Sequence, residues 1–325
     1  MWKSYKGDDS DWDKVPGVNL SFFQSLAWAQ YKSDSGWEYL HFVWHDELKN
    51  ESFGVQVLVK KKLFVSIAWI PGCHPDFFNT NNKDFYKLLK SVIGTCFTYC
   101  RINITHDKDQ CRTLILKGST WFKPLKLLNS GQSMILEIKS DVELMRSGLT
   151  KNWRHNLNRS EKHEITTEQW YNPSAHEMRE IYEEMEGFKG IAKQFSLEQI
   201  ESIIKAFGEN LVLYRCLDKD GKLIAFRGIG THGNQCTDFF AAASIDARKV
   251  YATYKLFWAI VEYCVNNDIL YYDLGGIDMV NNVGVYNFKK GTGAKHVEYM
   301  GEWEESTPSF FRYIINKVLK HIGGV

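Results

Sequence analysis

The predicted order of secondary-structure elements occurs twice along this chain, and this repeat restricts the possible folds more than any other feature. In the second half, three β-rich apolar segments are separated by turn sequences, which predicts an antiparallel meander. Apolar residues at helical spacing then run from Leu256 to Val265, and a further strand is expected. These second-half strands are expected at residues 211–217, 222–230, 235–243 and 269–274.

The first half has the same order, with a meander, a helix and a final strand. Its strands are expected at residues 39–45, 52–60, 63–70 and 101–105, with the helix at 85–100. The halves share no obvious sequence identity, so only the order of elements repeats. A meander, a crossover helix and a further strand give a mixed, mainly antiparallel sheet covered by helices. We therefore predict an α/β (α+β) protein of two similar halves.

Composition agrees with two folded halves and gives little sign of a partner. The 325 residues are 44% apolar and 14% aromatic, enough for two cores, and the formal net charge is only +1. Apolar runs, such as Ile67–Ile70, are far shorter than the roughly 18 residues that a membrane span needs. No signal-peptide-like stretch follows Met1. We expect a cytoplasmic monomer without stable membrane insertion.

The cysteines and histidines do not follow a metal-binding pattern. Seven cysteines include no Cys-x-x-Cys pair, and Cys96 and Cys100 would share one face of the expected helix. Small buried residues in a reducing compartment are the expected state of these cysteines. No His-Glu-x-x-His motif occurs among the histidines, so no metal is expected.

The C-terminal segment 309–322 has an apolar stripe at helical spacing. Pro308 suits the first turn of this helix, and Thr307 or Ser306 is its candidate cap. We expect the stripe to be buried against one of the halves. A helix lying on a membrane surface is the alternative, although its charged face is narrow.

The repeated element order is typical of the GNAT acyltransferase fold, which each half resembles. Enzymes of that fold that use coenzyme A hold its pyrophosphate on a glycine-rich loop between the last meander strand and the helix. Here that connection, residues 244–252, has no glycine and includes Asp246. The matching segment of the first half, 70–75, has one glycine and two prolines. Coenzyme A is therefore disfavoured as a donor.

Several blocks of residues, in order, resemble a known family. They are Phe23-Gln24-Ser25 followed by Trp28, Lys32 and Trp37; residues 149–156; Tyr272-Asp273-Leu274-Gly275-Gly276; residues 284–291, which include Phe288-Lys289; and residues 297–303. This pattern resembles the Fem family of aminoacyl-tRNA-dependent peptidyltransferases, which build interpeptide bridges of bacterial peptidoglycan precursors. The resemblance implies two GNAT-like domains, 1–143 plus 306–325 and 144–305. Only residues 165–205 separate the basic helix from the second meander, so the coiled-coil arm of some members is not expected.

The resemblance also implies catalytic residues. An aminoacyl ester is already activated, so the enzyme needs mainly to align two substrates and stabilise an oxyanion. Lys289, after Phe288, would supply that charge, and Lys290 remains the alternative one position on. The alternative is that both are ordinary exposed lysines in a loop before Gly291. Asp273 would end a strand where α/β sheets bind ligands, with Gly275 and Gly276 allowing close backbone approach and Asp278 a weaker candidate.

Further residues are candidates for binding the two substrates. Lys32, with Trp37 near it, would contact phosphates of the acceptor, while Tyr251, Tyr254 and Lys193 would line the cleft. Lys193 and Phe195 stand where the family offers an arginine and tyrosines, and this departure affects the identity of the acceptor. The basic stretch would track tRNA phosphates or form an ordinary solvated helix face, and Trp153 would stack on a nucleotide or pack inward. The basic stretch consists of Arg146, Lys151, Arg154, Arg159 and Lys162.

The expected function is therefore transfer of an amino acid from aminoacyl-tRNA, as co-substrate, to an amine of a nucleotide- or lipid-linked cell-wall or glycan precursor. No other cofactor is expected. Two alternatives stay open: an N-acyltransferase that uses coenzyme A, and a non-catalytic binding protein with the same fold. The sequence does not indicate which amino acid is transferred.

Overall fold

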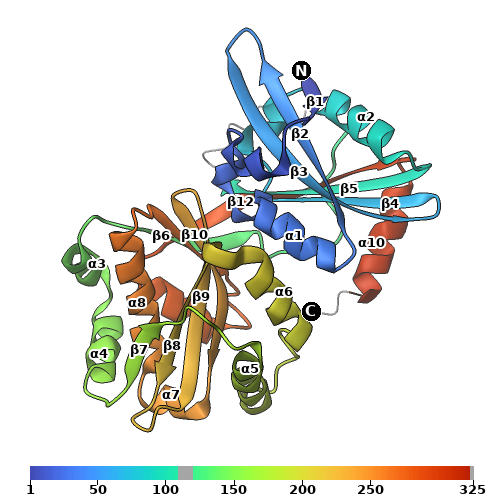
Figure 1. The fold of residues 1–325 in the computed structure, drawn as a ribbon. Helices are drawn as coiled ribbons and strands as arrows, with labels where there is room; N and C mark the ends of the chain where they lie inside the picture. Colours follow the sequence, from blue (N-terminus) through green and yellow to red (C-terminus); the bar gives the residue numbers. More distant parts are fainter. Residues whose placement is uncertain (109–119, 323–325) are drawn as a thin grey trace. The chain divides into compact units, whose positions relative to one another are not determined.

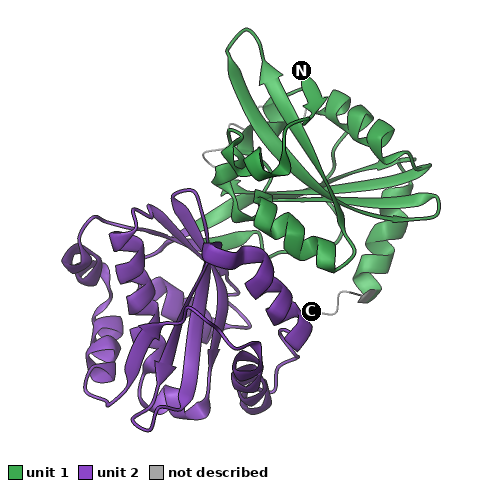
Figure 2. Cartoon of the chain, in the orientation of Figure 1, with its two compact units in different colours: residues 1–133, 297–325 green, residues 134–296 purple. Residues whose placement is uncertain are grey.

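The computed structural model describes residues 1–108 and 120–322, which form two compact units. Unit 1 comprises residues 1–133 and 297–325, and unit 2 comprises residues 134–296 (Figure 2). Each unit contains a mainly antiparallel sheet flanked by helices (Figure 1). The two-half α/β architecture expected from the sequence is confirmed.

In unit 1 the strand order is β1-β2-β3-β4-β5-β12, and the only parallel pair among its described strands is β4 with β5. The strands are β1 (Trp2–Ser4), β2 (Glu38–Asp46), β3 (Glu51–Lys62), β4 (Val65–Pro71), β5 (Phe97–Asp107) and β12 (Lys295–Thr307). The helices are α1 (Leu26–Asp34), α2 (Asn82–Ile93) and α10 (Phe311–Ile322).

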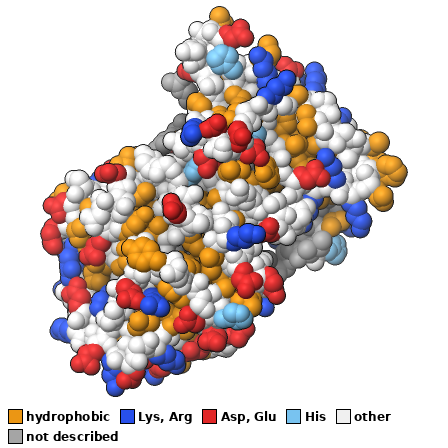
Figure 3. Space-filling model, in the orientation of Figure 1, with side chains coloured by type: hydrophobic (Ala, Val, Ile, Leu, Met, Phe, Trp, Pro, Cys, Tyr) orange, Lys and Arg blue, Asp and Glu red, His pale blue; other side chains and the backbone are white. Residues whose placement is uncertain are grey.

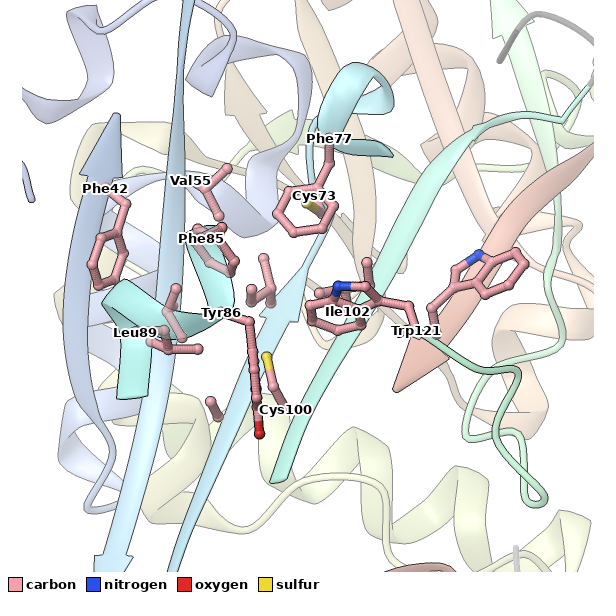
Figure 4. Close-up of a cluster of buried hydrophobic side chains, with 14 of the residues drawn as sticks. Phe42, Val55, Cys73, Phe77, Phe85, Tyr86, Leu89, Cys100, Ile102 and Trp121 are labelled. Atoms are coloured by element: carbon pink, nitrogen blue, oxygen red, sulfur yellow. The ribbon is translucent and has the colours of Figure 1, made fainter. Parts of the chain in front are cut away.

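The two faces of the unit 1 sheet are covered by different helices. Successive side chains of β3 point to opposite faces. Val55, Val57 and Val59 lie in one core with Phe85 and Leu89 of α2, together with the aromatic residues drawn in Figure 4. On the other face, the Gln56 side chain donates to the Ser25 carbonyl at the start of α1. Helices α1 and α2 therefore cover opposite faces.

In unit 2 the order is β6-β11-β10-β9-β8-β7, with β10 and β11 parallel. The strands are β6 (Gln132–Glu137), β7 (Thr166–Gln169), β8 (Leu211–Leu217), β9 (Leu223–His232), β10 (Gln235–Ala243) and β11 (Tyr271–Gly276). The helices are α3 (Val142–Gly148), α4 (Lys151–Ser160), α5 (Ala175–Lys189), α6 (Leu197–Phe207), α7 (Ile245–Lys249), α8 (Ala252–Asn266) and α9 (Val283–Gly291). Helices α5 and α6 are short, and α5 packs on the sheet, so the expected lack of a long arm holds for the described residues.

The parallel strand pairs of the two units differ in length. In unit 1, β4 pairs with β5 over its whole length, from Val65 to Pro71. In unit 2, β10 pairs with β11 only from Gln235 to Thr237, and a bulge follows at Asp238–Phe240. The rest of β10 is paired with β9 alone. The two parallel strands of unit 2 therefore separate in the middle of β10.

Some boundaries differ from those predicted. Both meanders are confirmed, but the first-half helix ends at Ile93, because Gly94 takes the left-handed conformation (φ +74°) that terminates helices. Cys100 therefore lies in β5 rather than on a helix, and Cys96 precedes that strand. Cys96 is exposed, contrary to expectation, while the other described cysteines are buried.

The unit boundaries fall at 134 and 297, whereas the sequence suggested 144 and 306. Met134 and Leu136 of β6 belong to the core of unit 2, so this strand is part of the second unit. Met300 and Trp303 of β12 belong to the core of unit 1. In both cases the core into which the side chains of the strand pack decides the unit to which the strand belongs.

Helix α10 belongs to unit 1, where Phe311 packs against Phe97 of β5. The Ser306 hydroxyl accepts from the Arg312 N–H, so Ser306 rather than Thr307 satisfies a backbone donor in the first turn. Only part of the predicted apolar stripe is buried, since Ile314 and Val318 are 49% and 46% exposed. The prediction of a buried stripe is therefore wrong for this edge of the helix.

Candidate functional site

Lys289 lies on helix α9 rather than in a loop, and it is buried, which rules out for this residue the alternative of an exposed lysine. Its Nζ donates to the carbonyl oxygens of Gly275 and Gly276, at 3.1 and 2.9 Å. Gly275 has φ +78°, which a residue with a side chain adopts only at a cost, and a Cβ there would lie 3.7 Å from this Nζ. The Gly-Gly turn after β11 thus brings two carbonyls to the lysine. Lys290, in contrast, is exposed.

A buried ionic network lies close to Lys289. The Arg227 guanidinium donates to both carboxylate oxygens of Asp238, at 2.9 and 2.7 Å, and the Tyr272 hydroxyl donates to Asp238 at 2.9 Å. Burial raises the pKa of Asp238, whereas Arg227, Tyr272 and Lys289 oppose that shift. Burial and, less strongly, Arg227 lower the pKa of Lys289, against the effect of Asp238 and Asp273.

Aromatic side chains cover this network. Phe288 packs edge-on against Tyr254 and Phe257 of α8, with ring centroids 5.2 and 5.7 Å apart. Trp153 of α4 packs on the same group, and its indole N–H donates to the Phe288 carbonyl at 3.2 Å. Trp153 is only 2% exposed, so it packs inward and is not free to stack on a nucleotide. These contacts fix the position of α9 and therefore of Lys289.

The arrangement can stabilise a negative charge. An ammonium group has three N–H donors, and two of those on Lys289 bind glycine carbonyls. The third can donate to an oxyanion, and limited access of water strengthens such a bond. Asp273 lies on the same strand-to-turn segment, and its carboxylate accepts from the Gly275 N–H at 2.8 Å. In this structure Asp273 therefore holds the turn that positions Lys289.

A cavity of 110 Å³ lies beside this network, where β10 leaves β11. It is lined by Ala241–Ala243 of β10, Arg227, Thr253 and Leu256, with Met185 and Lys189 of α5 among its other residues. Its walls are mostly apolar. The cavity thus offers room for a small group next to Arg227.

Two acidic groups, one from α5 and one from α7, lie at the connection from β10 to α8, where a phosphate cradle would be needed. Glu184 accepts a hydrogen bond from the Ile245 N–H at the start of α7, at 3.0 Å. Asp246 in the next position forms an exposed ion pair with Lys249. Carboxylates at this helix start compete with and repel a pyrophosphate.

Lys32 lies in unit 1, in an aromatic environment on α1. Its Nζ is 4.6 Å from the ring centroid of Trp28, 4.7 Å from that of Tyr31 and 5.7 Å from that of Trp69. Burial, together with the nearby charge of Lys60, lowers the pKa of Lys32 to about 8.

Trp37 lies beside this group, because its ring packs against Trp69 at 6.0 Å and faces the Lys60 ammonium at 5.2 Å. Two cations among aromatic rings suit an anionic ligand with a planar group.

The Gln24-Ser25 motif explains how Lys32 is held. The Gln24 amide donates to the Pro71 carbonyl at 2.7 Å, and its oxygen accepts from the Gln56 N–H at 2.7 Å. Ser25 caps α1 by accepting from the Trp28 N–H. This motif is structural, since it ties the start of α1 to β3 and β4.

Three members of the basic stretch, Lys151, Arg154 and Arg159, lie on α4, and Lys162 follows shortly after the end of that helix. Lys151, Arg154, Arg159 and Lys162 are exposed, while Trp153 on the opposite side is buried. Arg159 lies 4.7 Å over the ring of Tyr251. Arg146, on α3, is instead paired with Glu161 at 3.0 Å and donates to Asn158. It is the member whose charge is already partly neutralised.

Among the remaining candidates Tyr254 contacts Phe288, whereas no contact in the described structure joins Lys193, Tyr251 or Asp278 to Lys289. Lys193 is exposed in the connection between α5 and α6, and no contact in the described structure joins it to the network. Tyr251 has φ +58° and caps α8, and the hydroxyl of Tyr254 accepts from Asn156 at 3.0 Å. Asp278 holds its own turn by accepting from the Val280 and Asn281 N–H groups.

Sequence reasoning missed Arg227, Asp238 and Tyr272. A signal for the first two was present, because each is a lone charged residue inside an apolar strand segment. Buried charges of this kind are expected to be paired. Which strand would bring the partner depends on the register between β9 and β10, which the sequence leaves open.

Comparisons with known proteins agree with this fold and with these motifs. The model of the FemAB family matches residues 150–321, which is more than half of the chain. No curated protein sequence matches.

Solved structures show the same architecture over nearly the whole chain. A structure described as "Crystal structure of FemX" has a TM-score of 0.80 at 15% identity and covers 97% of this chain and 100% of its own. L-PGS from Bacillus licheniformis has a TM-score of 0.55 at 14% identity, covering 95% of each chain. A tandem GNAT protein from the clavulanic acid biosynthesis pathway has a TM-score of 0.53 at 9% identity, covering 94% of this chain and 98% of its own. The expected GNAT-like architecture is confirmed, and at such identities the structures show the fold alone.

The family match includes the basic helix, the Gly-Gly turn and the Phe288-Lys289 pair, so the site described above lies within the matched region. This chain belongs to the FemAB family.

Proposed function

We propose that this protein transfers an amino acid from aminoacyl-tRNA to an amine of a cell-wall or surface-glycan precursor, forming an amide bond. The observation that carries this proposal is the buried Lys289 ammonium, which binds two glycine carbonyls and retains one donor. We expect the reaction to take place in the cytoplasm, with no cofactor besides the two substrates.

In the proposed reaction the acceptor amine attacks the ester carbonyl carbon of the aminoacyl group. A C–N bond forms, the C–O bond to the tRNA ribose breaks, and the proton lost by the amine goes to the ribose oxygen. The third N–H of Lys289 donates to the carbonyl oxygen as it becomes an oxyanion. The charge of Asp238 keeps a cation favourable at this buried position.

Two other features support the same substrates. The exposed cations of α4 suit the phosphates of a tRNA acceptor arm, which give affinity without reading sequence. The Lys32–Lys60 pair, with Trp37 and Trp69, suits the phosphates and base of a nucleotide-linked acceptor. The small apolar cavity beside Arg227 favours an amino acid with a small side chain.

N-acyl transfer from a coenzyme A donor is the second candidate function. It is favoured by the separation of β10 from β11, which leaves one edge of β10 open. The carboxylates of Glu184 and Asp246 at the start of α7 weigh against it. We therefore rank this candidate below aminoacyl-tRNA.

The decisive experiment offers charged tRNA and acetyl-CoA in parallel to the purified protein, with a panel of amines that includes nucleotide-linked precursors. Amide formation from charged tRNA alone is the expected result. Turnover with acetyl-CoA alone would assign the second candidate. Ligand binding without turnover for either donor would instead support a non-catalytic binding protein.

A further inference from the structure

One exposed surface of unit 1 is unusually apolar. It combines residues of the segment before β6 with residues at and near the start of α10, and we call it the α10 surface. Its exposed apolar residues, between 43% and 71% accessible, are Phe122, Leu125, Leu127, Leu128, Phe310, Tyr313, Ile314 and Val318. Apolar patches of this kind on a soluble unit mark interaction sites.

The two segments of the α10 surface are held together by buried polar contacts. The Lys126 N–H donates to the Asn316 side chain at 3.1 Å, and the Arg312 guanidinium lies 4.0 Å over the Phe122 ring. Asn316 in turn donates to the buried Glu304 of β12 at 2.6 Å. These contacts hold the two segments of the α10 surface in a fixed position relative to each other and to β12.

Helix α10 has two apolar sides. Phe311 is buried, and Ile315 and Leu319 on the same side are half-buried. Ile314 and Val318, four residues apart, share the exposed side. A helix that only completed the core of unit 1 would need the first side alone.

The charge of the α10 surface has a single sign. Residues 120–133 and 306–322 contain five lysines and arginines and no aspartate or glutamate, although the whole chain has 40 basic and 39 acidic residues. By contrast, acidic and basic side chains are interspersed over the face drawn in Figure 3. Within the described structure Lys126, Lys317 and Lys320 have no acidic partner. Glu304, beneath them, is fully buried and lies 3.6 Å from Arg312.

We propose that the α10 surface docks this protein on an anionic phospholipid bilayer, with α10 lying in the headgroup region. Exposed apolar side chains flanked by lysines meet the two requirements of such a surface, partial burial in the interface and attraction to anionic lipid. Lysine stems can follow the apolar boundary while their charges stay at the headgroups. This proposal goes beyond the transfer reaction and does not depend on it.

A second copy of the chain fits this surface less well. A symmetric dimer would place the same patch on both sides, and the segments that form it contain no acidic residue that could pair with Lys317 and Lys320 of the other copy. Docking also needs no spanning segment, and none of the helices in the described residues has the length and apolar character to cross a membrane.

The test is sedimentation of the full chain with vesicles of phosphatidylglycerol and phosphatidylcholine in equal parts, and with vesicles of phosphatidylcholine alone. We expect binding to the anionic vesicles that weakens as salt rises. The double variant Lys317→Glu, Lys320→Glu should lose at least about thirtyfold in affinity. The control Lys87→Glu, Lys90→Glu changes the net charge equally, at the same spacing on α2 of the same unit, and should bind like the unaltered protein.

A second pair of changes, Ile314→Ser with Val318→Ser, tests the apolar contribution and should weaken vesicle binding at high salt. Equal binding to neutral and anionic vesicles, no binding to either, or an equal fall in affinity for the test and control lysine variants would overturn the proposal. Sedimentation equilibrium of the protein without vesicles tests whether the α10 surface instead binds a second copy of the chain. A dimer that these serine changes dissociate, with vesicle binding unaltered, would assign the surface to a second copy instead.

Discussion

Replacing Lys289 by methionine tests the proposed site most directly. Methionine keeps most of the length of the side chain but removes all three donors, so the oxyanion loses its hydrogen bond while the aromatic packing around α9 is retained. Removal of one oxyanion donor typically lowers turnover by about 100- to 1,000-fold, or about 2.7–4 kcal/mol of transition-state stabilisation. Because this interaction forms in the transition state, substrate binding should change little.

The burial of Lys289 also predicts an effect on stability, which an exposed lysine would not have. The change leaves the Gly275 and Gly276 carbonyls without their Nζ donor, and a buried carbonyl without a donor costs about 1–3 kcal/mol. Gly276 is exposed, so water can replace one of the two bonds, and removal of a buried charge offsets part of the rest. We expect the variant to remain folded, with a moderately lower melting temperature.

Lys290→Met is the matched control, since Lys290 is the neighbouring lysine but is exposed. It should change stability by about 0.5 kcal/mol or less and leave turnover nearly normal. Single-turnover rates with charged tRNA, alongside thermal denaturation, distinguish the two variants. Near-normal turnover of Lys289→Met would refute the assigned role. Loss of turnover in Lys290→Met alone would instead place the catalytic lysine one position later.

Other features of the two units lead to predictions about Lys32, the α4 face and Trp153. Affinity for a nucleoside diphosphate should fall as pH rises through about 8, where Lys32 loses its proton, and this dependence should vanish in Lys32→Met. Between pH 8 and about 10.5, Lys32 is more often deprotonated in the folded protein than in the unfolded chain. The contribution of Lys32 to the free energy of unfolding should therefore rise with pH in that window. Reversing the charges of Lys151 and Arg154 should make tRNA binding less dependent on salt. The slope of log affinity against log salt concentration should fall in magnitude by about 0.7–0.9 for each phosphate that the protein no longer neutralises. Trp153→Ala should destabilise unit 2 by about 3–5 kcal/mol, measured by denaturant unfolding.

Each of these predictions has its own control. Reversing Lys219 and Lys222, which lie at the turn between β8 and β9, changes the charge of unit 2 equally and should leave the salt slope of tRNA binding unaltered. An equal effect of both charge reversals would indicate that the α4 face is an ordinary solvated surface with no specific role in tRNA binding. For Lys32, a pH dependence that survives in the methionine variant would assign it to another group. A Trp153 variant as stable as the unaltered protein would contradict the packing role of that indole.

The sequence alone determined the element order, the family resemblance and the identity of the strongest candidate residues. Alternation of apolar residues and turn chemistry are local, so the second meander was predicted almost to the residue at Leu211–Leu217 and Gln235–Ala243. The Gly275-Gly276 turn and Phe288-Lys289 were recognised as a motif. Recognition of the motif, however, did not show which groups Lys289 contacts or how deeply its side chain is buried.

Only the tertiary structure decided the environments. Arg227 and Asp238 become a buried pair because β9 lies against β10 in one register, and a slip of one residue would point their side chains to the opposite face of the sheet. Trp153, from a helix more than a hundred residues earlier, donates to the Phe288 carbonyl on α9, and the buried Lys289 of the same helix reaches the carbonyls of Gly275 and Gly276. Likewise, the residue spacing of the apolar stripe of α10 can be read from the sequence, but which side is buried depends on the contact of α10 with β5. Burial is a property of contacts between distant segments, and local sequence patterns do not specify which segments meet.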